Sequence, residues 1–398
     1  MPEDRFTEVT SQSWFSRIGG AIKGILLGLA LFLLAFPLLF WNEGRSLTTY
    51  KSLKEGGSTV VSVASDSIDP ANAGKLIHLS GFADTKATLT DEDFGVSVNA
   101  LKLRRNSEMY QWKEESSSET SKKLGGGTET VTEYTYTRVW SEKVINSDNF
   151  KRSQGHQNPG AIPYSSREQA ADRVTLDAFT LSPSLLSKIN SFEPLLISSE
   201  TPLPEALKNK AQVYDAGFYI GTEAANPQVG DVRIKFEMVK PVDVSVIAKQ
   251  VGNSFAPYVT KASGSIELLQ VGEHSADAMI AEAQASNKML TWLLRLAGFI
   301  CMTVGLNLIL RPLSVVADVL PIVGTIVGAG TGLVAALIAA PASLLTIAIA
   351  WLFYRPLLGI TLIVIAIALT VVLKRKLKAA KDNVQAAAVE MDSANKPA

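Results

Sequence analysis

Cysteine is almost absent from this chain: only Cys301 occurs in its 398 residues, and it lies inside an apolar stretch. A disulfide framework is therefore excluded, and any domain in an oxidising compartment must be stabilised by its own hydrophobic core. Histidine is scarce as well, because His78, His156 and His274 lie far apart in the sequence. No Cys/His cluster has the spacing of metal ligands, so neither a metal site nor a cofactor is expected.

An excess of charge of one sign is also missing, since 38 Lys and Arg residues balance 38 Asp and Glu residues. Nucleic-acid binding needs a concentrated basic face, so no nucleic-acid partner is expected. Catalytic signatures are absent too: the sequence has no G-x-S-x-G elbow, no H-E-x-x-H motif and no Walker loop. These absences disfavour an enzyme and identify no catalytic residue.

Long uncharged runs are what the chain does contain. The first, residues 24–41, corresponds to about 27 Å of helix, which matches a hydrocarbon core of roughly 30 Å. Three more apolar runs follow at residues 289–310, 324–354 and 356–373. The sequence therefore predicts four transmembrane helices, with residues 42–288 inserted as one polar domain between the first and the second.

Basic residues flank these runs. Arg17 and Lys23 precede the first run, Arg311 follows the second, and Lys374 follows the fourth. The positive-inside rule places such residues in the cytoplasm. We therefore expect residues 1–23 and 374–398 to be cytoplasmic tails, residues 311–323 to be a cytoplasmic, interfacial segment, and residues 42–288 to face the periplasm or an organelle lumen.

The inserted domain carries mostly extended-chain signals. Two aromatic segments, residues 110–112 and 134–140, flank a polar stretch rich in Ser, Glu, Lys and Gly, which is typical of a long hairpin with its tip near residues 116–128. Ser275 precedes an alanine-rich segment and is expected to cap a helix that runs into the second span. The predicted fold is a multi-pass α-helical membrane protein with a large α+β, β-rich extracytoplasmic domain between the first and second spans.

The predicted hairpin and the loop after it carry the candidate binding residues. Aromatic side chains on adjacent strands pack against each other across the strands, or they form a platform for a partner or ligand. The loop histidine is either an acid/base group or a hydrogen-bonded structural residue. The candidate residues for partner or ligand binding are Tyr110, Trp112, Tyr136, Trp140, Asn149, His156 and Asn158.

Small and charged residues inside the apolar runs suggest how the helices associate. Gly324, Gly328 and Gly332 recur every four residues, a spacing that lets helix backbones approach closely, within one bundle or between copies. Arg295 lies near the start of the second span, where it either extends to the lipid headgroups or pairs with a partner inside the membrane.

Several of these segments resemble the LUMA family, four-pass proteins of the animal nuclear envelope. The similar segments span nearly the whole chain in order. They are FWNEGR, MYQWKEE, TYTYTRVWSEKVINSDNFKRSQGHQNPGAI, VGDVRIKF, MTVGLNLILRPL and WLFYRPL. The motif positions shared with the family are Asn42, Glu43, Tyr110, Trp112, Tyr136, Trp140, Asn149, His156, Asn158, Pro159, Asn307 and Arg311.

The resemblance implies a multi-pass protein with both ends in the cytosol and a large lumenal domain. In animals the family is linked to nuclear-membrane organisation, self-association, and contact with emerin and lamins, and it carries no established enzymatic activity. The inserted domain has no N-x-Ser/Thr sequon, which favours a bacterial relative in an inner membrane. In a eukaryote, the endoplasmic reticulum or inner nuclear membrane is expected instead.

Three functions remain open from the sequence. The first is a non-enzymatic membrane scaffold, embedded in the lipid bilayer, that forms a homo-oligomer or binds an unknown membrane or extracytoplasmic protein. The second is a small-ligand binder or enzyme with a pocket near Trp112, Trp140 and His156. The third is a channel or transporter, motivated by Arg295 and Asn307 near membrane depth.

Overall fold

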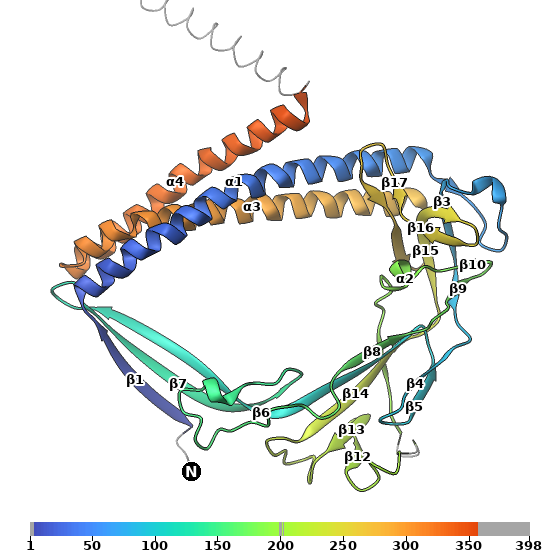
Figure 1. The fold of residues 1–398 in the computed structure, drawn as a ribbon, viewed down its shortest axis with the longest axis horizontal. Coiled ribbons are helices and arrows are strands. Elements are labelled where there is room, and N and C mark those ends of the chain that lie inside the picture. Colours follow the sequence, from blue (N-terminus) through green and yellow to red (C-terminus); the bar gives the residue numbers. More distant parts are fainter. Residues whose placement is uncertain (1–3, 199–200, 202, 357–398) are drawn as a thin grey trace, which may run out of the picture. The chain divides into compact units, whose positions relative to one another are not determined.

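The computed structural model describes residues 4–198, 201 and 203–356 and shows a β-rich part and long helices (Figure 1). The expected fourth span, from residue 357 onward, and the basic tail lie outside the described residues. The chain divides into two compact units. The first comprises Met1–Gly20, Thr48–Asn287 and Ser314–Val327, and the second comprises Ala21–Leu47, Lys288–Leu313 and the chain from Gly328.

Three long helices contain the first three apolar runs. They are α1 (Trp14–Thr59), α3 (Ala276–Ala317) and α4 (Pro321–Tyr354), and each is long and apolar enough to cross a membrane. The predicted architecture is confirmed, because these helices flank a β-rich domain. Each is longer than a span requires: α1 has 46 residues, about 69 Å of helix.

The ends of α3 follow local sequence signals. The Ser275 side chain accepts a hydrogen bond from the Ala278 N–H at 3.3 Å, which confirms the predicted cap. At the other end, α3 continues through Arg311 and Pro312 before it stops, and α4 begins at Pro321 after a short break. The segment expected to be interfacial, residues 311–323, therefore joins two helices.

The larger sheet contains the predicted hairpin. Its antiparallel path runs β1-β7-β6-β14-β13-β12, with β8 paired to β6 and β11 paired to β14. The hairpin is confirmed by fourteen registered pairs, from Met109 opposite Ser141 to Lys122 opposite Thr128. The expected tip at residues 116–128 was too long, because both strands continue through most of it and leave only residues 123–127 for the turn. The eight strands are β1 (Arg5–Gln12), β6 (Lys102–Lys122), β7 (Thr128–Ser141), β8 (Arg167–Ala170), β11 (Glu193–Leu195), β12 (Ala211–Tyr214), β13 (Gly217–Ile220) and β14 (Val232–Val239).

The N-terminal strand β1 belongs to this sheet. Its residues were expected to belong to a cytoplasmic tail, yet they pair antiparallel with β7, from Arg5 opposite Thr135 to Gln12 opposite Thr128. Figure 1 shows β1 beside the long β6–β7 ribbon. The N-terminus is therefore part of the folded β-rich unit.

A second sheet completes the β-rich unit. Its central strands β3 and β15 pair antiparallel over eight registered positions, and the two sheets share one hydrophobic core that includes Phe94, Phe218 and Val246. The remaining elements are β2 (Val61–Ser62), β3 (Leu76–Asp84), β4 (Thr88–Asp91), β5 (Val96–Asn99), β9 (Thr175–Leu176), β10 (Phe179–Thr180), α2 (Pro183–Leu186), β15 (Val242–Val251), β16 (Ser254–Ala256), β17 (Tyr258–Val259), β18 (Ser265–Ile266) and β19 (Leu268–Val271).

The helical unit packs through small residues. A Cβ added to Gly28 of α1 would lie 2.6 Å from the Gly305 carbonyl oxygen of α3, and one added to Gly305 would lie 2.7 Å from that of Gly28. Only glycine permits so close an approach of two backbones. Leu39, Met302 and Ala339, one from each helix, contribute to its buried core.

Candidate functional site

The candidate residues of the hairpin lie on one face of β6 and β7. Tyr110 is registered opposite Trp140, with ring centroids 5.0 Å apart, and Trp112 is opposite Arg138, whose guanidinium lies 5.2 Å from the Trp112 ring. Tyr136 is opposite Glu114. Alternate residues of a strand share one face, so the aromatic set forms a continuous ladder along the ribbon.

One end of this ladder is closed by His156. Its ring stacks on Tyr136, with centroids 4.0 Å apart, and meets Trp112 edge-on at 4.7 Å. The Nδ1 atom donates a hydrogen bond to the Arg152 carbonyl at 3.1 Å. The residue is only 1% exposed, so its ring is covered by the residues around it. These contacts pack the loop that carries His156 onto the ribbon.

Asn158 holds the same loop against β6, because its side chain makes hydrogen bonds to the Trp112 backbone that a neighbouring strand would otherwise make. Its Oδ1 accepts the Trp112 N–H at 2.7 Å, and its Nδ2 donates to the carbonyls of Trp112 and Ile145 at 2.8 and 3.0 Å. Its own N–H donates to the Ser147 hydroxyl. Asn149, by contrast, is exposed at the end of a short 3-10 helix (Ser147–Asn149).

The other end of the ladder opens into a pocket of about 530 Å³. Trp140 forms one wall, and Tyr214 and Tyr219, from the hairpin β12–β13, form another. The Arg233 guanidinium lies 4.7 Å from the Trp140 ring, and its Nε donates to Glu108 at 2.6 Å. Of the predicted set, Trp140 lines this pocket, whereas Trp112 and His156 are not among its lining residues.

The rim of this pocket carries a paired charge on a constrained turn. Lys235 Nζ lies 2.6 Å from Asp215, and this ammonium group lowers the pKa of the Asp215 carboxyl. Asp215 and Ala216 have φ angles of 50° and 57°, which residues with a side chain seldom adopt. A turn held in this conformation presents Tyr214 and Asp215 in a fixed arrangement.

Two buried phenols support the ladder and the pocket. Burial, followed by the hydrogen bond to Glu114 at 2.7 Å, raises the pKa of Tyr136 to about 12. Burial and a hydrogen bond to Asp231 likewise raise the pKa of Tyr219. Both groups are neutral donors at physiological pH, so they hold strands in place and offer no base for catalysis.

The helical unit contains a buried ion pair that the sequence only partly indicates. Arg295 of α3 donates to both carboxylate oxygens of Glu43 of α1, at 2.7 and 2.8 Å, and Trp351 Nε1 of α4 donates to Glu43 at 2.8 Å. Glu43 is 4% exposed. Arg295 is therefore a paired cation that ties three helices together, and this pairing accounts for its position without an ion pathway.

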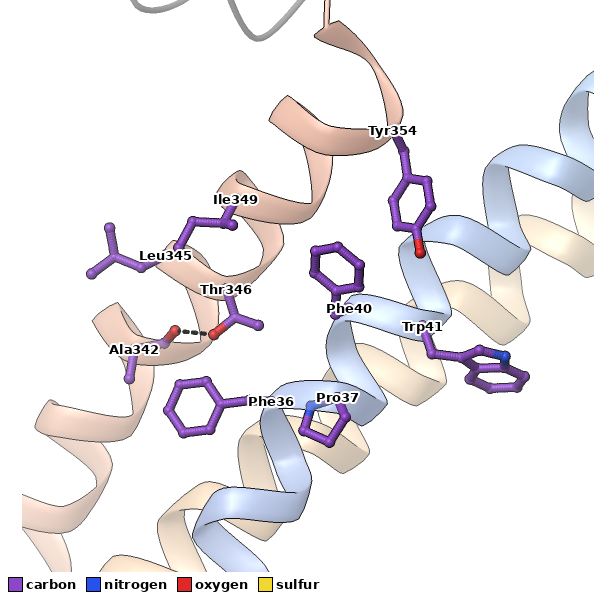
Figure 2. A pocket seen from close by; sticks show the side chains of 9 residues that line it. All are labelled: Phe36, Pro37, Phe40, Trp41, Ala342, Leu345, Thr346, Ile349 and Tyr354. Carbon is purple, nitrogen blue, oxygen red and sulfur yellow. Dashed lines mark hydrogen bonds between the residues drawn. The ribbon is translucent and has the colours of Figure 1, made fainter.

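The same unit holds an apolar cavity of about 830 Å³ between α1 and α4. Figure 2 shows Phe36, Phe40 and Tyr354 around it, with the Thr346 hydroxyl turned to its own helix. That hydroxyl donates to the Ala342 carbonyl at 2.8 Å, and most of the other lining residues are apolar. Its apolar lining suits hydrocarbon.

The candidate packing glycines of α4 occupy different surroundings. A Cβ added to Gly324 would lie 1.7 Å from Asp318 Oδ1, so glycine is required at the break between α3 and α4. Gly332 faces Asn307 at an ordinary contact distance of 3.9 Å. The closest helix approach described above, at Gly28 and Gly305, was not among the predicted positions. The G-x-x-x-G-like spacing of Gly24 and Gly28 was the available signal.

Comparison with known proteins supports one family. The sequence pattern of the family described as Transmembrane protein 43 matches residues 109–356. The mouse Transmembrane protein 43 is 39% identical over 366 residues, which cover 88% of this chain and 90% of the mouse protein. The human protein is 38% identical over 390 residues (93% and 96%), and the Drosophila homologue is 30% identical over 355 residues (85% and 90%).

No solved structure matches this chain. The family pattern nevertheless covers more than half of the sequence, and the animal relatives cover nearly all of it. The resemblance to the LUMA family is thereby confirmed at the level of the family. The chain is a multi-pass membrane protein that belongs to the Transmembrane protein 43 (LUMA) family.

Proposed function

We propose that this protein is a non-enzymatic membrane scaffold whose β-rich domain binds a second copy of itself or a protein partner. The observation that carries the proposal is the pocket at Trp140. Trp, Tyr and Arg are the residues enriched in interface hot spots, and here Trp140, Tyr214 and Arg233 surround one concave surface. The long apolar helices would hold this surface beside the bilayer.

The chemistry of the pocket favours a partner segment with an apolar anchor. Trp140 and the exposed Tyr214 offer flat apolar surface, and the two cations at the rim are already paired, Arg233 with Glu108 and Lys235 with Asp215. A strongly charged ligand would have to break these pairs. Membership of the family supports an organising role, and the sequence pattern favours a bacterial inner membrane. The extracytoplasmic placement of residues 42–288 stays a prediction.

The test is site-specific crosslinking in the native membrane. A photoreactive residue at Tyr214, which is 50% exposed on the pocket rim, is expected to capture a second copy or a partner. The matched position is Val259, which is 69% exposed on the β17–β18 hairpin and should capture neither. Trp140→Ala should weaken capture about tenfold or more, as expected for a hot-spot residue. A strictly monomeric protein without crosslinks at Tyr214 would contradict the proposal.

A small-ligand binder is the second candidate, because a volume of about 530 Å³ falls within the range of ligand sites. The pocket lies at Trp140 and Tyr219, and not at Trp112 and His156. A ligand that raises the unfolding temperature of the wild type but not of Trp140→Ala would favour this function over the scaffold.

A further inference from the structure

The apolar cavity between α1 and α4 is open along one side. Phe36 and Phe40 of α1 form part of its wall (Figure 2), while Trp41, Leu345 and Ile349 also line it and are 56%, 63% and 58% exposed. All five residues belong to the helical unit. An unfilled hollow of about 830 Å³ leaves its wall without dispersion contacts on one side, and an apolar occupant would restore them.

The chain itself supplies an apolar segment at the rim of this cavity. Tyr354, the last residue of α4, lines the cavity, and a Cβ added to Gly44 of α1 would lie 2.5 Å from its ring. The helix is interrupted at Arg355, as expected for a residue that precedes proline, and Pro356 is helical again. The apolar run 356–373 therefore begins two residues beyond the cavity wall.

The length and direction of this run match the cavity walls. The run 356–373 has 18 uncharged residues, as many as the run 24–41 of α1. Lys374 follows it, and the positive-inside rule places this residue on the same side of the membrane as Lys23. A helix that starts near the depth of Trp41 and returns over about 27 Å thus runs antiparallel to α1 and α4 and ends where the run 24–41 begins.

The side chains of the run are also suited to the cavity. Gly359, Ile363 and Ala366 follow one another at i, i+4 and i+7, so they share one face of a helix. Two of the three are small, whereas the cavity wall carries the large rings of Phe36 and Phe40. Small residues on one helix let large residues on its neighbour pack closely in lipid.

We propose that residues 356–373 form the fourth helix of the bundle and fill the cavity between α1 and α4 with the face that carries Gly359, Ile363 and Ala366. A second copy of the chain would have to find the cavity by diffusion, whereas this run is tethered at its rim. A lipid acyl chain would lose conformational freedom when held there, whereas a helix is already ordered.

The test is disulfide formation in native membranes, in a Cys301→Ser background that carries no other cysteine. Ile349 and Ile363 lie six and eight residues from Arg355, so antiparallel helices bring them to about the same depth. Ile349→Cys with Ile363→Cys should form a disulfide within one chain when a membrane-permeant oxidant is added. Ile349→Cys with Thr361→Cys, at a similar depth but on the opposite face, should give at least tenfold less.

Ser118→Cys with Thr132→Cys, two directly opposed residues of the β6–β7 hairpin, shows that oxidation was effective and that the domain is folded. Absence of the Ile349–Ile363 disulfide while this control forms overturns the proposal, and so do equal yields with Ile363→Cys and Thr361→Cys.

A photoreactive residue at Ile349 distinguishes the possible occupants. The expected product is a crosslink to a peptide from residues 356–373 of the same chain, identified by mass spectrometry. A crosslinked dimer would assign the cavity to a second copy, and an added lipid mass would assign it to the bilayer. Either of these two results overturns the proposal.

A second measurement does not depend on engineered cysteines. Ala366→Leu adds volume on the face that meets the cavity and should shift the loss of helical signal to a lower fraction of sodium dodecyl sulfate. Ala368→Leu makes the same change about 200° around the helix and should leave this midpoint unchanged. Equal shifts in the two variants overturn the proposed orientation of the helix in the cavity.

Discussion

At the scale of single residues, a loop asparagine and a loop histidine decide what the aromatic ladder can do. Asn158 makes three hydrogen bonds to strand and loop backbone, and His156 fills the space between Trp112 and Tyr136. Sequence could identify both residues as special, because they lie in a loop rich in Gly, Asn and Pro. It could not distinguish a ligand site from a packed loop, since that depends on burial.

Asn158→Ala is expected to lower the free energy of unfolding by about 1–3 kcal/mol. The substitution leaves the Trp112 N–H and two carbonyl groups without their partner in a poorly hydrated site. Chemical denaturation of the solubilised protein measures the change. Asn149→Ala is the matched control, because this exposed residue should shift stability by less than about 0.5 kcal/mol. Equal effects of both substitutions would contradict the assigned role of Asn158.

The raised pKa of Tyr136 predicts that the stability of the folded protein falls at alkaline pH. Its pKa is raised from 10 in the unfolded chain to about 12 in the folded protein. The contribution of the neutral phenol to the free energy of unfolding is therefore complete below pH 10. That contribution is lost as the pH rises from 10 through 12. Thermal unfolding followed across this range should show a falling midpoint, and Tyr136→Phe should flatten part of the fall. An unchanged slope in Tyr136→Phe would contradict the assignment.

At the scale of elements, local signals predicted more than distant ones. The hairpin follows from two aromatic segments separated by a polar turn, and the start of α3 follows from the Ser275 cap. Strand β1 was missed because its partner β7 lies more than a hundred residues away, and a short polar strand has no local feature that reveals such pairing.

The Glu43–Arg295 pair predicts how the helices are held together. Arg295→Met should destabilise the helical unit by about 3–5 kcal/mol, because it leaves the Glu43 carboxylate buried without its cation. Glu43→Leu combined with Arg295→Met removes both charges and should recover most of the loss. Resistance to sodium dodecyl sulfate, followed by the loss of helical signal, measures both variants. A double variant as unstable as the single one would contradict this interpretation.

At the scale of the whole molecule, hydropathy and charge predicted the apolar helices and the inserted domain, and similarity supplied the family. These patterns describe each segment by itself. They carry no information about which segments pair after folding, and a strand such as β1 can therefore be assigned to a tail. The pocket at Trp140 was missed in part, because Tyr214, Tyr219 and Arg233 come from strands that the sequence does not place beside β7.

Strand β1 is synthesised well before the strand with which it pairs. It leaves the ribosome before α1, whereas β7 follows roughly 120 residues later, about ten seconds at typical translation rates. The strand must stay unpaired during that interval. Asp4, just ahead of it, lies 3.6 Å from the sealed ring of His156, so a purification tag fused to the N-terminus would crowd this contact. Affinity tags and fluorescent fusions therefore belong at the C-terminal end of the chain.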